Sequence, residues 1–358
     1  MGNSLPPKTA QILDNLVILG EKLVRICKGE GVTPAEKNFH RLITNLESYN
    51  PWFIPEFTLE AVRGMVRMLD RDVLTRWIGR YTDKLSEEHA AVTVAVINAG
   101  NIPGVGFHDF ISVLISGHYY LGKLSHSDDK LLPAIGELLI ETDSSMEGMF
   151  RFTTGKVSGF DAVIATGSDN TARYFDYYFG RYPNIIRRNR NGVAVLTGRE
   201  SDDDLKGLAR DIFLYFGMGC RNVAKLYVPG NYDFDRFFSL TGDFAFVANH
   251  HKYRNNYDYY KSIYLINKVP HLDNGYLLLA EESRFSSPPG VVFYETYREV
   301  DDVLNSLKVH SGSIQCVTGP AGISEMLIPF GTTQLPAPWD YPDGIDTMEF
   351  LLKLGING

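Results

Sequence analysis

The sequence is poor in cysteine and has no excess of positive charge. It holds three cysteines in 358 residues, Cys27, Cys220 and Cys316, and no Cys-x-x-Cys pair. An odd number of distant cysteines excludes a disulfide framework and does not match zinc-ligand spacing, so we predict no metal site. With 35 basic and 43 acidic residues, the net charge is -8. This balance argues against a dedicated nucleic-acid-binding protein.

Long apolar runs are also missing. No run reaches the ~18–20 residues that a membrane-spanning helix needs, so we predict no membrane span. The N-terminus shows no apolar signal-peptide core, and Pro6 stands where a myristoylation pattern needs Ser or Thr. Together with the cysteine usage, these features predict a cytoplasmic protein.

What is present is the composition of an ordinary globular protein, 44% hydrophobic and 22% charged. The length suggests two or three domains. We divide the chain into a mainly helical segment, two α/β sections and a C-terminal segment. Their expected ranges are residues 1–90, 91–195, 196–330 and 331–358.

Strands and helices alternate in both α/β sections. Residues 92–97 form a short apolar, β-branched run typical of a buried parallel strand, and a helical pattern follows over 107–116. Further strands are expected at 119–124 and 160–165. This alternation predicts βαβ units and a largely parallel sheet.

The second section starts with an expected strand at 193–196 and an amphipathic helix over 202–217, followed by a strand at 225–228. The stretch 232–264 is rich in Tyr and Phe and has no clear pattern. It fits an acyl-binding tunnel, but it fits a core or an oligomer interface better.

Cys220 stands in the segment Gly-Met-Gly-Cys-Arg-Asn, at the end of the expected helix. Glycines allow close approach of a ligand to the backbone, and the neighbouring Arg221 would favour the nucleophilic thiolate. The residues alone equally fit a small buried side chain in a tight turn. Cys27 and Cys316 lie in apolar patterns, and both fit core packing.

Polar residues follow three expected strands. They are Asn101 after the first strand, Lys123 at the end of the second, and Thr166-Gly167-Ser168 after the third. Ligands of open α/β sheets bind at the carboxyl ends of the strands. Each residue also fits an ordinary role as a turn residue, a solvated lysine or a helix cap. The Gly-x-Gly-x-x-Gly fingerprint of Rossmann folds is absent.

Taken in order, these segments resemble the aldehyde dehydrogenase superfamily. The resemblance covers roughly residues 90–350. Within the superfamily, the sequence segments are most similar to those of acyl-CoA reductases of the bacterial luminescence type. The segments that carry it are Gly-Asn-Ile-Pro at 100–103, Gly-Lys-Leu-Ser-His-Ser-Asp at 122–128, Thr-Gly-Ser-Asp-Asn-Thr-Ala at 166–172, Asp-Ile-Phe-Leu-Tyr-Phe-Gly-Met-Gly-Cys-Arg-Asn at 211–222 and a C-terminal Asp-Gly-Ile-Asp-Thr.

The resemblance implies an aldehyde dehydrogenase-like fold with two Rossmann-like α/β domains and an active site between them. It implies a cofactor domain at 91–195 and a catalytic domain at 196–330. Cys220 would be the nucleophile and Asn101 an oxyanion donor. The implied cofactor-binding residues are Lys123, Ser125, Thr166, Gly167, Ser168 and Glu282.

Two departures from the superfamily pattern refine this interpretation. Hydrolytic members carry a glutamate base where this chain has Val195-Leu196-Thr197-Gly198, although Glu200 is close by. The residue three beyond Lys123 is His126, and not the glutamate that repels a 2′-phosphate in NAD-preferring members. The missing base favours acyl-CoA reduction over aldehyde oxidation by water. His126 favours NADPH, with NADH possible.

The sequence therefore predicts an NADPH-dependent acyl-CoA reductase that forms an aldehyde through a cysteine acyl-enzyme. The alternatives are an aldehyde dehydrogenase working in the oxidative direction and a cysteine acyltransferase or thioesterase without a redox cofactor. The expected substrate is an acyl-CoA thioester. The resemblance further implies a homo-oligomer and an acyl-activating partner protein.

Overall fold

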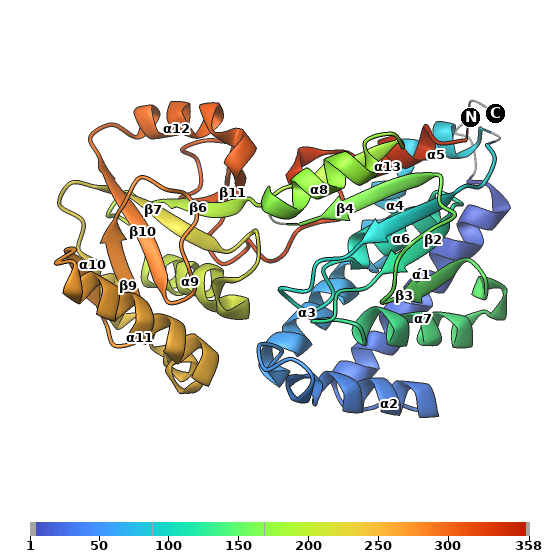
Figure 1. Ribbon diagram of the computed structural model, residues 1–358, viewed down its shortest axis with the longest axis horizontal. Helices are drawn as coiled ribbons and strands as arrows, with labels where there is room; N and C mark the ends of the chain where they lie inside the picture. Colours follow the sequence, from blue (N-terminus) through green and yellow to red (C-terminus); the bar gives the residue numbers. More distant parts are fainter. Residues whose placement is uncertain (1–4, 88, 168, 356–358) are drawn as a thin grey trace. The chain divides into compact units, whose positions relative to one another are not determined.

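The computed structural model describes residues 5–87, 89–167 and 169–355 (Figure 1). The chain folds into two compact units. The first contains the chain up to Arg188 together with the segment from Ala337 onward, and the second contains Asn189–Pro336. Each unit is built on its own sheet.

The first unit holds a five-stranded parallel sheet in the order β3-β2-β1-β4-β5. Its strands are β1 (Thr93–Ile97), β2 (Tyr119–Lys123), β3 (Phe150–Thr153), β4 (Ala162–Thr166) and β5 (Asn184–Arg187). The predicted α/β architecture with a parallel sheet is confirmed. The apolar β-branched run that predicted the first strand is β1 itself.

Helices cover both faces of this sheet (Figure 1). They are α1 (Pro7–Cys27), α2 (Pro34–Ile43), α3 (Pro55–Met68), α4 (Arg71–Ile78), α5 (Thr82–Leu85), α6 (Phe107–Ile115), α7 (Leu131–Thr142), α8 (Asp169–Phe179) and α13 (Thr347–Leu352). Successive strand residues point to opposite faces. Val94 and Val96 therefore join the large core with α1, α6 and α7, while Ala95 packs on the side of α8.

The second unit holds a seven-stranded sheet in the order β12-β11-β6-β7-β10-β9-β8. The pairings are parallel except that β8 runs antiparallel to β9. The strands are β6 (Asn191–Val195), β7 (Val223–Pro229), β8 (His271–Asp273), β9 (Leu278–Glu281), β10 (Val291–Tyr297), β11 (Ile314–Thr318) and β12 (Leu327–Ile328). The helices are α9 (Asp202–Phe213), α10 (Phe234–Ser239), α11 (His251–Ile266) and α12 (Val300–Val309).

Helix α9 ends earlier than the sequence predicts. Its start matches, because Ser201 and Asp204 form a capping box. The predicted end at residue 217 is wrong: α9 stops at Phe213, and a 3₁₀ turn, η4 (Leu214–Gly217), follows. In that turn Tyr215, Phe216 and Gly217 adopt positive φ angles of 54°, 56° and 75°. A left-handed run of this kind cannot continue a right-handed helix.

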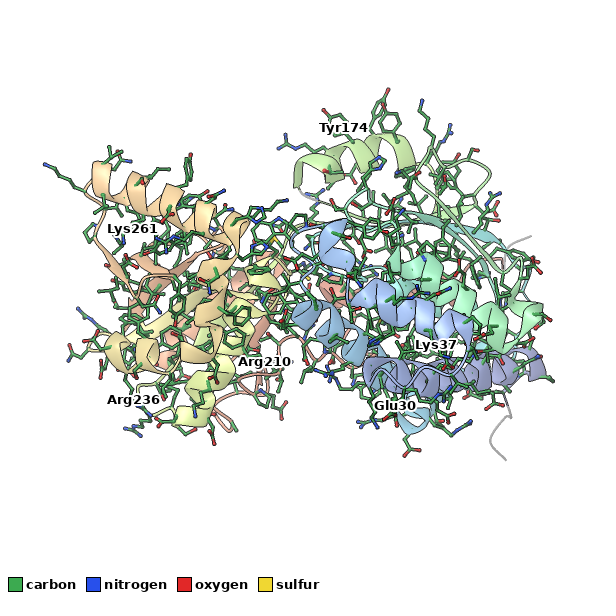
Figure 2. All side chains as sticks on the ribbon, turned by 90° about the horizontal axis from the view of Figure 1, so that it is seen from below. Glu30, Lys37, Tyr174, Arg210, Arg236 and Lys261 are labelled. Carbon is green, nitrogen blue, oxygen red and sulfur yellow. The ribbon has the colours of Figure 1, made fainter. Side chains whose placement is uncertain are left out.

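The aromatic-rich stretch that showed no clear pattern is largely helical. It contains α10, the 3₁₀ helix η5 (Gly242–Asn249) and α11. One face of α11 buries Tyr253 and Tyr257, and the opposite face exposes Tyr259. Lys261 of α11, which is labelled in Figure 2, forms a 2.7 Å ion pair with Asp273, and this pair ties α11 to β8. The buried tyrosines of α11 thus serve as core.

Candidate functional site

The carboxyl ends of the strands in the first unit bring most of the predicted cofactor residues to one edge. Ile97 pairs with Lys123 on β2 and with Ala165 on β4, so these three strands end at the same level. The chain winds from β1 to β2 and β3 in one direction and to β4 and β5 in the other. The point between β1 and β4 is therefore a topological switch point, where ligands of such sheets bind.

The predicted residues occupy this edge as follows. The loop after β1 carries Asn101, whose side chain is exposed. Thr166 is the last residue of β4 and Gly167 follows it, and both are half-buried. Ser168 lies outside the described residues. The described part of the Thr-Gly-Ser segment and the Asn101 loop thus belong to strands that flank the switch point.

Lys123 and Ser125 stand at the end of β2. The Lys123 Nζ donates hydrogen bonds to the carbonyl oxygens of Leu124 (3.1 Å) and Thr154 (2.7 Å), which fix the ammonium group at the sheet edge. A Cβ on Gly100 would lie 2.5 Å from the Ser125 Oγ. Only glycine at position 100 lets the loop of Asn101 approach Ser125 this closely.

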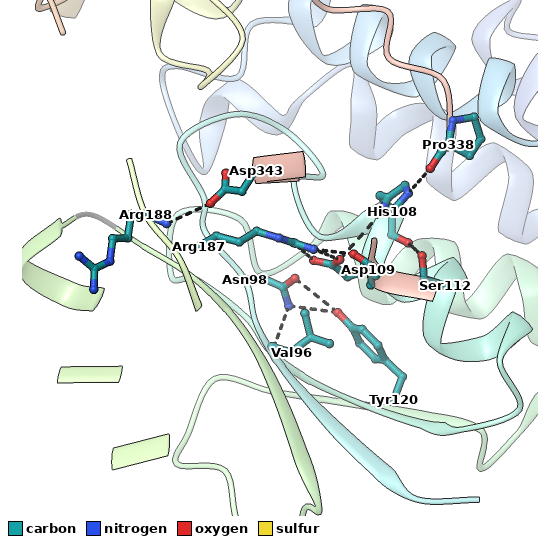
Figure 3. Close-up of polar contacts among 11 residues, drawn as sticks. Val96, Asn98, His108, Asp109, Ser112, Tyr120, Arg187, Arg188, Pro338 and Asp343 are labelled. Atoms are coloured by element: carbon teal, nitrogen blue, oxygen red, sulfur yellow. Dashed lines mark hydrogen bonds and ion pairs between the residues drawn. The ribbon is translucent and has the colours of Figure 1, made fainter. Parts of the chain in front are cut away.

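A buried asparagine supports the loop after β1 (Figure 3). The Asn98 Nδ2 donates to the carbonyl oxygens of Val96 and Lys123, each at 3.3 Å, and to the Tyr120 hydroxyl at 3.1 Å. On the other side of the loop, a Cβ on Gly106 would lie only 1.7 Å from the Asn98 Oδ1. Asn98 therefore fills the space that a side chain at position 106 would need.

Asp128 holds the same loop from the β2 side. Its Oδ2 accepts the N–H of Gly104 at 2.7 Å, while its buried Oδ1 has no hydrogen-bond partner among the residues that the structure describes. Burial raises the pKa of Asp128 to about 6, although the N–H groups of Gly104 and Leu131 oppose this shift. The segment at 122–128, which contains the predicted cofactor-binding residues Lys123 and Ser125, therefore also contains a carboxyl group that supports the loop after β1.

The basic residues at 187–190 are engaged within the protein, and Arg187 is almost fully buried. Its guanidinium forms two hydrogen bonds of 2.6 and 2.8 Å with the Asp109 carboxylate and one of 3.0 Å with the Thr347 hydroxyl (Figure 3). Burial alone would raise the pKa of Asp109, but the Arg187 charge and the contact with His108 hold it well below the usual range. Arg187 thus fastens the C-terminal segment to β5 and α6.

In the second unit, Cys220 stands on the turn between η4 and β7. Its side chain is exposed, whereas Tyr215 and Phe216 in the left-handed run before it are buried. The Phe216 ring lies 4.3 Å from the ring of His250 and 5.8 Å from that of Tyr253. The turn is thereby packed against α11, and the cysteine is presented at its outer end.

Asn222 fixes this turn, a role that the residue pattern did not predict. Its Nδ2 donates to the carbonyl oxygens of Asp211 (2.9 Å), Ile212 (3.4 Å) and Leu214 (2.8 Å) at the end of α9. Its Oδ1 accepts the N–H of Gly219 at 2.8 Å. Asn222 is 1% exposed, so these bonds form away from water. An asparagine two residues after the cysteine was the only sequence signal.

A buried carboxylate lies behind the same turn. Asp211 accepts hydrogen bonds from the Gly331 N–H (2.7 Å) and from the N–H (3.0 Å) and hydroxyl (2.8 Å) of Thr333. Burial raises its pKa to about 6 despite these donors. The Arg221 Nε in turn donates to the Thr333 carbonyl oxygen at 2.5 Å. Both neighbours of Cys220 in the chain are thus held by buried side chains or by the loop at 331–333.

The three cysteines differ sharply in their surroundings. Burial raises the pKa of Cys316 to about 12, and its Sγ donates to the Arg221 carbonyl oxygen at 3.7 Å. Burial also raises the pKa of Cys27. A raised pKa suppresses the thiolate, which is the reactive form. Cys220 is the exposed thiol of the three.

Glu282 directly follows β9 and is half-buried. Its carboxylate accepts the Ser283 N–H (2.9 Å) and forms a 3.1 Å ion pair with Arg284. Burial would raise the pKa of Glu282, but the bonds from Arg284 and Ser283 lower it, so these neighbours stabilise the carboxylate form. The Ser283 carbonyl oxygen is held by the Nζ of the buried Lys225 at 2.6 Å.

Metal-ligand clusters and membrane-spanning helices are both absent from the part of the chain that the structure describes. No group of three or more His, Cys, Asp or Glu side chains in the described ranges could hold a metal ion. None of the helices in the same ranges is long and apolar enough to cross a membrane.

Comparison with known proteins identifies the fold. Neither a protein-family model nor a curated protein sequence matches the chain. Among solved structures, it is similar to an NAD-dependent aldehyde dehydrogenase from Sinorhizobium meliloti, with a TM-score of 0.64, 13% identity, and coverage of 89% of this chain and 71% of that one. The indole-3-acetaldehyde dehydrogenase AldA of P. syringae, in complex with NAD+ and IAA, gives a TM-score of 0.61, 15% identity, and coverage of 88% and 73%.

A third similar structure is aldehyde dehydrogenase 21 of Physcomitrella patens, in complex with the reaction product succinate. It gives a TM-score of 0.58 at 14% identity and covers 82% of this chain and 70% of that one. The chain therefore has the aldehyde dehydrogenase fold of two Rossmann-like α/β units, as the sequence predicts.

Proposed function

We propose that the chain is an acyl-CoA reductase that converts an acyl-CoA thioester, with a fatty acyl group as the expected substrate, to an aldehyde with NADPH. The observation that carries this proposal is the setting of Cys220: an exposed thiol on a turn fixed by buried hydrogen bonds, in an aldehyde dehydrogenase fold. The other two thiols have raised pKa values and do not compete.

In the proposed reaction the Cys220 thiolate attacks the thioester carbonyl carbon, and the bond to the coenzyme A sulfur breaks. The acyl group remains on Cys220, and coenzyme A leaves as its thiolate. The resemblance to the superfamily assigns the Asn101 amide and the Cys220 N–H as the expected donors to the oxyanion of this step. The hydride for the acyl carbon would come from a reduced nicotinamide when that cofactor is bound, and the bond to the Cys220 sulfur would then break, which releases the aldehyde and returns the thiolate.

The residues at the sheet edge of the first unit suit a nicotinamide cofactor. An ammonium group and a hydroxyl stand together at the end of β2, beside a topological switch point. We propose that Lys123 and Ser125 hold the adenosine ribose and that Thr166-Gly167-Ser168 lies by the nicotinamide. Glu282, with its lowered pKa, would accept hydroxyls of the nicotinamide ribose. The exposed His126 leaves NADPH favoured and NADH possible.

The hydrogen bonding of Glu200 supports acyl-CoA reduction as the function, in preference to aldehyde oxidation by water. A hydrolytic aldehyde dehydrogenase needs a glutamate that is free to activate water. The Glu200 carboxylate accepts the N–H (2.5 Å) and hydroxyl (2.8 Å) of Thr197 and the N–H of Gly198 (3.1 Å), and it is 4% exposed. A carboxylate occupied in this way closes a turn after β6 and is poorly placed to act as a base.

The test follows NADPH oxidation with a panel of acyl-CoAs, for the wild type and Cys220→Ala. We expect oxidation that depends on the thioester, disappears in the variant and is more efficient in kcat/KM than with NADH. Cys316→Ala is the matched control and should retain activity. Release of coenzyme A without nicotinamide oxidation would instead support a cysteine acyltransferase or thioesterase. Assembly into a homo-oligomer and an acyl-activating partner stay predictions.

A further inference from the structure

A buried lysine in the second unit contacts the loop that begins with Glu282. Lys225 is the third residue of β7, and its side chain is 0% exposed. Its Nζ donates a 2.6 Å hydrogen bond to the carbonyl oxygen of Ser283, in the 282–285 loop that follows β9. It also forms an ion pair with Glu295 on β10. The ammonium group thus joins β7 and β10 to the end of β9, three neighbouring strands of the sheet.

Two aromatic rings complete the surroundings of this ammonium group. The Lys225 Nζ lies 5.1 Å from the centre of the Tyr227 ring and 5.0 Å from the centre of the Phe285 ring. Both distances allow cation–π attraction. Phe285 belongs to the 282–285 loop, and it packs against the core cluster that contains Tyr227. Lys225 therefore contacts the loop at two residues, through the Ser283 carbonyl and through the Phe285 ring.

The same loop holds the Glu282 carboxylate. Its Oε1 accepts the Ser283 N–H at 2.9 Å, and its Oε2 pairs with Arg284 at 3.1 Å. The Glu282 N–H donates to the Tyr294 carbonyl oxygen at 3.1 Å, which fixes the backbone on β10. The Glu282 side chain is 33% exposed, so a ligand can reach it. The main chain of Ser283 thus connects the two groups: its N–H holds the carboxylate, and Lys225 holds its carbonyl.

The burial of Lys225 is coupled to the position of this loop. Burying an ammonium group removes its hydration, and one carboxylate offsets that cost only if further hydrogen bonds are made. For Lys225 the further bond goes to Ser283. An apolar side chain at position 225 would leave the Ser283 carbonyl without this donor. The lysine therefore restrains the loop in a way that an apolar core residue would not.

We infer that Lys225 is a positioning residue for Glu282: it holds the 282–285 loop so that the carboxylate is presented to hydroxyl groups of the nicotinamide ribose. This inference deepens the proposed function and rests on it for the cofactor contact of Glu282. Lys225 is itself buried. Its effect on a ligand must therefore pass through the loop, and this dependence can be measured.

The first test measures hydrogen exchange of the full chain without any ligand. Lys225→Met should raise the exchange rate of the peptide that spans the 282–285 loop about 10-fold, because the loop loses a hydrogen bond from a charged donor. The Glu295 side chain is 37% exposed, so water can solvate it in this variant. The matched control Lys206→Met replaces an exposed lysine on α9 and should leave the rate unchanged. Equal rates in the two variants would overturn the inference.

The second test measures the Kd of NADPH from its fluorescence on binding. Glu282→Gln should weaken binding about 10-fold, since a charged hydrogen-bond acceptor is lost. Lys225→Met should weaken it about 5-fold, and the double variant should bind no more weakly than Glu282→Gln alone. Adenosine 2′,5′-bisphosphate lacks the nicotinamide ribose, so its Kd should not change in Lys225→Met. Losses that multiply in the double variant would overturn the inference.

Phe285→Leu serves if Lys225→Met does not fold. It keeps an apolar side chain and removes the ring that faces the Lys225 Nζ. It should weaken NADPH binding about 2-fold, with no further loss in the Glu282→Gln background. A loss of the same size in that background would count against the inference.

These tests separate the inference from the proposed function, because neither uses an acyl-CoA thioester. If NADPH binds and the double variant shows coupling, but no acyl-CoA is reduced, the proposed function fails and the role of Lys225 stands. If thioester-dependent oxidation occurs but the losses multiply, the proposed function stands and the inference fails. A wild type that binds neither NADPH nor NADH would overturn both.

Discussion

Two loops carry the chemistry-bearing residues, and each is held by one buried asparagine and one buried aspartate. In the first unit, Asn98 and Asp128 support the loop of Asn101. In the second unit, Asn222 and Asp211 support the turn of Cys220 and the loop beside it. In both units, a buried asparagine and a buried aspartate thus hold the loop at the end of a strand or helix in place by hydrogen bonds.

The two aspartates differ in how completely they are bonded. Asp211 uses both carboxyl oxygens, whereas the buried Oδ1 of Asp128 finds no hydrogen-bond partner within the described ranges of the chain. A buried acceptor without a donor costs about 1–3 kcal/mol. The comparison indicates that the Cys220 turn is the more fully stabilised of the two, and that the Asn101 loop retains a local weakness.

Among these comparisons, the largest expected effect comes from removing the side-chain amide of Asn101, the proposed oxyanion donor in the first loop. Asn101→Ala should lower kcat by about 10²- to 10³-fold, since the loss of one oxyanion donor costs about 2.7–4 kcal/mol. The Asn101 side chain is exposed, so the thermal midpoint should not change. Steady-state NADPH oxidation at saturating acyl-CoA measures this, with the exposed Asn255→Ala as the control. An unchanged kcat would remove Asn101 from the oxyanion site.

The next effect compares the two buried asparagines. Asn222→Ala should lower the free energy of unfolding by about 3–4 kcal/mol, because it strips donors from carbonyl groups at the end of α9. Asn98→Ala should cost about 2 kcal/mol, since the bonds of Asn98 are longer. Urea unfolding, with hydrogen exchange of peptides from each loop, measures both losses. Equal losses, or a larger loss for Asn98→Ala, would contradict the ranking.

The sequence predicted β1, β2 and β4 of the first sheet, but it predicted neither β3 and β5 nor the side chains that support the two loops. A run of β-branched residues as short as 92–97, bounded by turn residues, strongly favours a buried strand, so β1 could be found directly. The end of α9 could not be predicted in this way. Tyr215 and Phe216 adopt positive φ, and neither residue type indicates such a conformation in a sequence. Asn222 and Asp211 were missed for a similar reason: their roles depend on Leu214 and Thr333, which only the fold brings near.

The smallest expected effect tests the difference between the two aspartates by pH. The pKa of each is raised from about 4 to about 6. Between these values the native protein keeps a proton that the unfolded chain has lost. The stability contribution is therefore present below pH 4 and is lost as the pH rises to 6 and above. A shift of this size corresponds to about 3 kcal/mol for each group.

Replacing each carboxyl by an amide should then give different outcomes at pH 8. Asp128→Asn removes the ionised form and keeps an oxygen for Gly104, so it should leave stability unchanged at pH 4 and raise it by about 2 kcal/mol at pH 8. Asp211→Asn places an N–H group against a donor of Gly331 or Thr333, which cancels the gain. Thermal unfolding at both pH values decides, with Asp203→Asn as control. If both variants gained equally at pH 8, the missing partner of the Asp128 Oδ1 would have no energetic consequence, and the two loops would be equivalent.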